Sequence, residues 1–105
     1  MPINALIDLL PDLVVLVRRD GIVLGHGGGH GLSGLKLNGE SVGKRLENLW
    51  PETVAELVMH LTRRAIAHRA SAEARFQDSG QHYEARLSAQ GPDRALCVIR
   101  PAVWP

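Results

Sequence analysis

The stretch from residue 51 to residue 68, PETVAELVMHLTRRAIAH, constrains the fold more than any other part of the chain. Its apolar residues recur at the spacing of one helical face: Val54, Leu57, Val58, Leu61 and Ala65. Pro51 suits the start of a helix, because its missing N–H would have no partner there in any case. We therefore expect a long amphipathic helix that must bury this stripe against another element.

Three strand-like runs follow that stretch, at residues 71–78, 81–89 and 94–103, and turn residues separate them. This pattern predicts an antiparallel meander on which the helix packs. Strand alternation alone leaves open which face of the meander meets the helix. Glu84 and Arg86 belong to the polar set, and we expect either a cross-strand charged pair or the polar floor of a pocket.

The first 24 residues predict a short helix and then a hairpin. Residues 1–10 carry a helical stripe of Ile3, Leu6, Ile7 and Leu10, and Pro11 ends it. A helix this short is unstable alone and must dock on something. Residues 12–18 are rich in β-branched residues, Asp20-Gly21 is a strong hairpin turn, and residues 22–24 predict the returning strand.

The middle of the chain has two different patterns. Residues 25–39, GHGGGHGLSGLKLNG, contain seven glycines and predict a loop with at most a turn or two of helix. Residues 40–50 have apolar side chains at helix-compatible spacing, with Ser41 as the expected cap: Val42, Leu46, Leu49 and Trp50. The predicted element order is helix, two strands, short helices, long helix and three strands.

Four segments of the chain, taken in this order, are similar to segments of a known family. PDLVVLVRRDGIVL is similar to the opening hairpin of PAS sensor domains, and VGKRLENLWPE to the family's Gly-Lys-x-Leu-x-x-Leu-x-Pro entry into the long helix. HYEARLSA and ALCVIRPAV resemble its last two strands. The chain departs from the family where a glycine run replaces an Asn-containing helical stretch. It departs again where residues 101–103, Pro-Ala-Val, stand in place of a final Asp-Ile-Thr.

The resemblance implies an α+β fold: a five-stranded antiparallel sheet in the order 2-1-5-4-3, with helices on one face. It implies one domain over residues 1–105, with a leading helix at 1–10 and a PAS core at 12–104. The implied role is a non-catalytic sensory, ligand-binding and dimerisation module of a bacterial signalling protein, such as a histidine kinase of a two-component system or a diguanylate cyclase. The output domain would belong to the same polypeptide.

Two sets of residues follow from that expectation. The leading helix would form a homodimer through Ile3, Leu6, Ile7 and Leu10. A small-molecule ligand would lie between the helix and the sheet, against Val15, Leu46, Leu49, Trp50, Leu57, Leu61, Phe76, Tyr83 and Ile99.

Composition excludes several other classes. A formal net charge of +1 gives no basic footprint for nucleic acid. No apolar run approaches the roughly 18 residues of a membrane-spanning helix, so we expect no membrane insertion. Cys97 is the one cysteine, which excludes an internal disulfide and fits a cytoplasmic protein.

Cofactors receive little support from the sequence. His26 and His30 could begin a metal site, but a zinc site needs three or four protein ligands and no third is evident, so we predict no metal. Haem would need a histidine near the apolar side of the long helix, and His68 suits this better than His60. Flavin photochemistry would need a cysteine in the early helical region, whereas Cys97 lies in the last strand. Haem and flavin are therefore not expected.

Two alternatives remain open. The same fold with a filled core would be a structural docking or dimerisation domain without a ligand. Removal of Met1 would expose Pro2, the base that tautomerases use, although residues 3–10 have the period of a helix and those enzymes begin with a strand.

Overall fold

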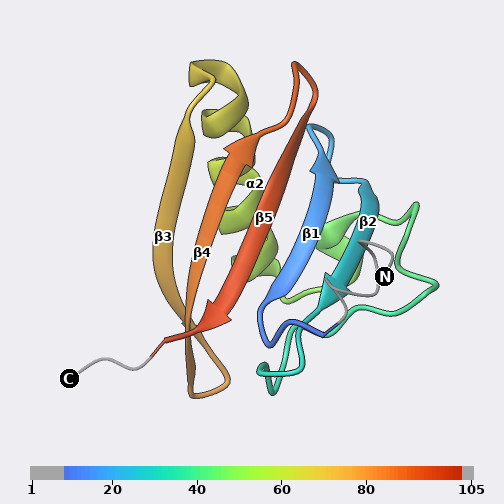
Figure 1. Cartoon of the computed structure of the whole chain (residues 1–105), viewed down its shortest axis with the longest axis vertical. Helices are drawn as coiled ribbons and strands as arrows, with labels where there is room; N and C mark the ends of the chain where they lie inside the picture. Colours follow the sequence, from blue (N-terminus) through green and yellow to red (C-terminus); the bar gives the residue numbers. More distant parts are fainter. Residues whose placement is uncertain (1–8, 103–105) are drawn as a thin grey trace.

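The computed structural model describes residues 9–102, which form a five-stranded antiparallel sheet with helical segments on one face (Figure 1). The strands are β1 (Leu13–Arg18), β2 (Val23–Gly28), β3 (Ser71–Asp78), β4 (Gln81–Ala89) and β5 (Arg94–Pro101). Their order is β2-β1-β5-β4-β3, with every neighbouring pair antiparallel. The predicted fold class is therefore confirmed. The predicted leading helix falls on residues 1–8, outside the described part, and on Leu9 and Leu10, which are not helical.

The long helix α2 (Glu52–His68) has the bounds that the sequence predicts, with Pro51 as its N-cap. It ends where Arg69 adopts a left-handed conformation and donates its N–H to the carbonyl groups of Ala65 and Ile66. The predicted stripe is buried except at Leu57, which is half-buried. The buried face is also wider than predicted and includes Ala55, Met59, Thr62 and Ile66.

The extra burial on α2 has identifiable causes. A Cβ placed on Gly21, in the β1–β2 turn, would lie 3.6 Å from the Met59 sulfur, so this turn covers one flank of the helix. The buried Thr62 hydroxyl donates to the Val58 carbonyl at 2.8 Å, which satisfies it inside the helix.

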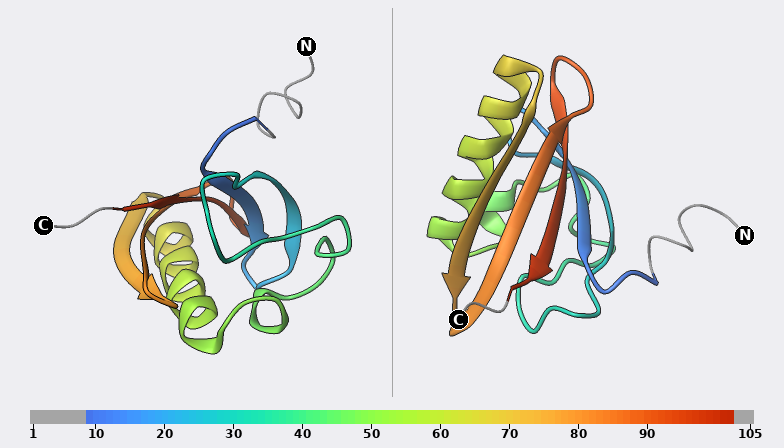
Figure 2. Two further views of the ribbon diagram at one scale, coloured as in Figure 1. Left: turned by 90° about the horizontal axis from the view of Figure 1, so that it is seen from below. Right: turned by 60° about the vertical axis from the view of Figure 1, so that its left-hand side comes forward.

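One face of the sheet meets α2, and the structure identifies it. The residues on this face are fully buried in the three central strands: Leu13, Val15 and Val17 in β1, Ala95, Cys97 and Ile99 in β5, and Tyr83, Ala85 and Leu87 in β4. Ala72, Ala74 and Phe76 continue it on β3 and are half-buried. The helix crosses β3, β4 and β5 (Figure 2).

The opening hairpin forms as predicted, but its second strand is longer. Gly21 has φ +95° and donates its N–H to the Arg18 carbonyl at 2.8 Å, which closes the turn. β2 then continues through the first glycines, and Leu13 lies opposite Gly28. A glycine backbone can form the hydrogen bonds of a β-ladder although it has no side chain, and here β1 is the strand with which these glycines pair.

The helix predicted over residues 40–50 is mostly absent, and that prediction is wrong. Only η1 (Leu46–Asn48) is helical, as a single 3-10 turn. Gly43 has φ +89°, which a helix cannot include, and its N–H donates to the Val23 carbonyl at 2.8 Å. Val42 is consequently 50% exposed. Ser41 caps a turn instead of a helix, since its hydroxyl oxygen accepts from the Asn38 N–H at 3.0 Å.

Candidate functional site

The nine residues predicted to line a ligand pocket come together around the space between α2 and the sheet. The fully buried members of this set are Val15, Leu46, Trp50, Leu61, Tyr83 and Ile99. Leu49, Leu57 and Phe76 are half-buried and pack against the same core. The rings of Phe76 and Tyr83 stack with their centroids 5.3 Å apart. The sequence therefore identifies a common region, and in it these side chains contact one another.

Within residues 9–102, Trp50 carries the one fully buried side-chain polar atom of this region that makes no hydrogen bond. Its side chain is 5% exposed, and its Nε1 donor is buried without a hydrogen bond. A buried N–H of this kind calls for a water or another acceptor beside it.

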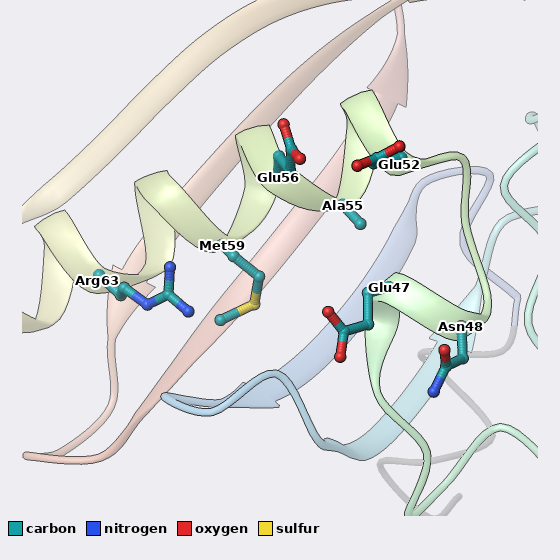
Figure 3. A pocket seen from close by; sticks show the side chains of 7 residues that line it. All are labelled: Glu47, Asn48, Glu52, Ala55, Glu56, Met59 and Arg63. Carbon is teal, nitrogen blue, oxygen red and sulfur yellow. The ribbon is translucent and has the colours of Figure 1, made fainter.

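The pockets that the structure describes lie elsewhere, and none of them is lined by the nine residues. The largest, about 520 Å³, is a groove between η1 and α2 (Figure 3). Ala55 and Met59 form its apolar side, and its polar lining consists of Glu47, Asn48, Glu52, Glu56 and Arg63. Glu47 is paired with Arg45 at 3.6 Å, and both side chains are more than half exposed. This groove is a solvated, mainly acidic surface.

A smaller cavity of about 200 Å³ lies beneath the glycine-rich loop, beside β1 and β2. Four leucine side chains, three glycines, His30 and Lys36 line it. The glycine content of this stretch predicts only a loop. The missed signal is its leucine spacing, since Leu32, Leu35 and Leu37 turn toward the core although glycines surround them.

The histidines do not form a metal centre in the described part of the chain, where no group of three or more potential ligands exists. The Nε2 atom of His26 lies 2.7 Å from the Asn38 carbonyl oxygen, in a hydrogen bond that holds the loop to β2. His30 lines the smaller cavity. His60 and His68 are exposed on α2, and His68 is its last residue, so neither faces the core where haem would lie.

Cys97 lies on the helix-facing side of β5 and is fully buried. Burial raises the pKa of its thiol to about 12, because the thiolate would lose its solvation there. At neutral pH the residue is a small, inert core side chain.

The opposite face of the sheet combines a charged part with an aliphatic part. Across strands, Arg86 pairs with Glu73 at 3.2 Å and Arg100 pairs with Glu84 at 3.3 Å. The predicted cross-strand charged pair is therefore present, with each residue paired to a different strand. Beside these pairs lie four aliphatic side chains of β1 and β5, which we call the outer patch: Val14, Leu16, Leu96 and Val98.

The residues predicted for the dimer and for tautomerase chemistry are largely outside the described part. Ile3, Leu6, Ile7 and Pro2 all fall there. Leu10 is described and is 42% exposed. Among residues 9–102, no helix has the length and apolar character needed to cross a membrane.

Solved structures with the same architecture are numerous. A domain of an HTR-like protein from Haloarcula marismortui superposes with a TM-score of 0.74 at 18% identity, over 89% of this chain and 99% of that one. The PAS domain of BvgS from Bordetella pertussis superposes with a TM-score of 0.70 at 14% identity, over 96% of this chain and 84% of that one. A sensory box sensor histidine kinase from Vibrio cholerae superposes with a TM-score of 0.69 at 15% identity, over 95% of this chain and 89% of that one.

No family model matches the sequence, and no curated protein matches it either. The sheet order, the helix that crosses it and these superpositions agree on one architecture. The chain has the fold of a PAS domain.

Proposed function

We propose that this chain is a non-catalytic sensory and dimerisation module of a cytoplasmic signal-transduction protein, with an output domain in the same polypeptide. The support is the PAS fold together with structural neighbours that include a sensor histidine kinase. The observation that carries the dimerisation part is the outer patch. Its four residues alternate along β1 and β5 with the buried ones, so they lie on the other face of the sheet. Figure 2 shows that α2 packs on one face of the sheet only.

The occupant proposed for the outer patch is a second copy of the chain. Its leading segment would supply the apolar residues predicted for the dimer, namely Ile3, Leu6, Ile7 and Leu10. Leu10 is large, apolar and 42% exposed in a single copy, so dimerisation would remove apolar surface from water on both partners. The cross-strand ion pairs beside the patch would form the polar rim of such an interface.

Light scattering on a size-exclusion column tests this dimer. Leu96→Glu places a carboxylate in the outer patch and should weaken dimerisation by about tenfold or more, because an unpaired buried charge is costly. Val42→Glu is the matched control: Val42 is 50% exposed, lies in the loop before η1 and is not part of the outer patch, so its substitution should leave the dimer intact. A chain that stays monomeric at high concentration would remove the dimerisation proposal.

The ligand-binding part rests on the nine-residue pocket prediction and on Trp50. An acceptor from a ligand beside its buried Nε1 would satisfy that donor. Native mass spectrometry of the purified protein checks this, since a retained ligand adds mass, and an absorption spectrum would display haem or flavin.

A structural docking or dimerisation domain without a ligand is the second proposal. A specific observation favours it, because the nine predicted pocket residues pack on one another and line none of the pockets described above. A native mass equal to that of the bare chain, combined with a dimer, would support this version over the sensory one.

A further inference from the structure

The cavity beneath the glycine-rich loop has an apolar floor. Leu13 of β1 is 2% exposed, and Leu32 and Leu35 of the loop are 3% and 6% exposed. Together with Leu37 they line a volume of about 200 Å³. This is roughly seven times the ~30 Å³ that a water molecule occupies in the liquid, and an apolar cavity of about 150 Å³ holds a benzene molecule. The space therefore suits an occupant with a short hydrocarbon part.

The polar part of the same lining is suited to negative charge. Among residues 9–102, no Asp or Glu lines the cavity, whereas Lys36 does. The Lys36 ammonium forms no ion pair with any residue in the described range 9–102. Lys36 is exposed, and its ammonium can form a charge-assisted hydrogen bond with an anion whose apolar remainder lies in the cavity.

The loop backbone contributes further donors. Across residues 33–37, none of the backbone N–H groups donates to another residue of the described chain. Four of these five residues line the cavity: Gly34, Leu35, Lys36 and Leu37. Successive backbone N–H groups form anion-binding concavities where the chain turns through a left-handed residue, and Leu35, with φ +58°, is such a residue in this loop. Water or a ligand must therefore satisfy these groups, and a carboxylate could accept from several at once.

Leu35 indicates that this loop conformation is held in place. It is a non-glycine residue with φ +58°, a region that side chains with a Cβ rarely adopt. Below the loop, the Tyr83 hydroxyl oxygen lies 3.3 Å from the position of a Cβ on Gly34, so the loop rests directly on the sheet there. Backbone strain of this kind persists only where the surroundings determine the conformation.

We propose that this cavity binds a small organic anion, a carboxylate with a short apolar tail. The tail would lie on the four leucines, and the carboxylate would accept hydrogen bonds from Lys36 and from the loop N–H groups. The site is distinct from the helix–sheet region predicted for ligands, since none of those nine residues lines it. This proposal names a class of ligand for the sensory role proposed above, and in that respect it rests on that role.

An amide NMR titration of the full chain tests the proposal, with sodium hexanoate as the probe at constant ionic strength. Hexanoate should shift the amide signals of residues 33–37 in a saturable way. Two probes with the same tail, 1-hexanol and hexylammonium, should not. Absence of a saturable shift, or the same response to all three probes, would overturn the proposal.

Three variants make the test specific to the charge at position 36. Lys36→Met keeps most of the side-chain length and should weaken hexanoate binding about tenfold, whereas Lys36→Arg should retain it. Lys44→Met is the matched control, since Lys44 is the other lysine of the chain, is exposed and lines no pocket described here. Equal losses in Lys36→Met and Lys44→Met would refute the assignment.

The outcome is independent of the dimer assay. The amide spectrum reports whether each variant is folded and whether it binds, in a monomer as well as in a dimer. Hexanoate binding by a monomeric chain would keep the site and reject the dimer, and a dimer without saturable shifts would do the reverse.

Discussion

Two leucine-to-alanine substitutions on neighbouring strands test which face of the sheet is the core. Leu87 on β4 lies opposite Cys97 of β5, and Leu96 lies opposite the next residue of β4, Ser88. The two leucines are thus close together but point to opposite faces. Leu87 is 0% exposed beneath α2, whereas Leu96 is half-buried in the outer patch.

The expected costs differ because only one substitution leaves a cavity. Leu87→Ala removes a fully buried side chain and should lower the free energy of unfolding by about 3–4 kcal/mol, the sum of lost apolar transfer and an unfilled space. At Leu96 water can occupy the vacated volume and part of the side chain is already exposed, so we expect about 1 kcal/mol or less.

Urea unfolding followed by circular dichroism measures both costs, at a protein concentration low enough to keep the chain monomeric. With an m-value of about 1–3 kcal/mol/M for a small protein, Leu87→Ala should lower the unfolding midpoint by roughly 1–4 M without changing m. In a thermal scan the same loss should lower Tm by more than about 10 °C. Equal costs for the two substitutions would refute the assignment of the helix-facing side.

Three further predictions concern single groups. Asp20 accepts a hydrogen bond from Arg18 at 2.8 Å, and this bond holds its pKa at about 2 instead of 3.8. Its contribution to stability should be complete above pH 3.8 and disappear as pH falls toward 2, so the Tm difference between the parent and Asp20→Asn should shrink over that range; a constant difference contradicts this. Gly21→Ala should destabilise the chain by about 1 kcal/mol or more in urea unfolding, because φ is +95°, whereas Gly25→Ala, with open space around its Cβ, should cost less; equal costs would count against a strained turn. Cys97 should react with a thiol reagent only after denaturation, and rapid labelling of the native protein would contradict its burial.

The sequence predicts best those elements whose apolar periodicity is determined by packing against a single other element. α2 and the three last strands have the predicted bounds, within two residues, because their apolar periodicity reflects burial against each other. The conformation of residues 40–50 was harder to predict. Their apolar residues have the spacing of a helix, but in the folded chain this segment forms backbone hydrogen bonds with Val23 instead. Local spacing contains no information about that partner.

The sites were predictable to different degrees for a similar reason. Strand alternation left open whether the face of Tyr83 and the face of Ile99 meet α2, so the PAS resemblance, and not alternation, predicted that both lie near Trp50. In the structure all three belong to one core cluster. The cavity at Lys36 depends on the path of a loop through irregular backbone angles such as φ +58° at Leu35, which no periodicity describes.

The pairing of β1 with β5 has a mechanical consequence. Leu13, where β1 begins, lies opposite Ile99, near the end of β5, so the chain enters and leaves the sheet at the same end of two adjacent strands (Figure 1). Tension between segments attached before β1 and after β5 would peel that ladder open one hydrogen bond at a time, instead of shearing all its bonds together. A twist applied at one attachment would reach the other through a single pair of strands.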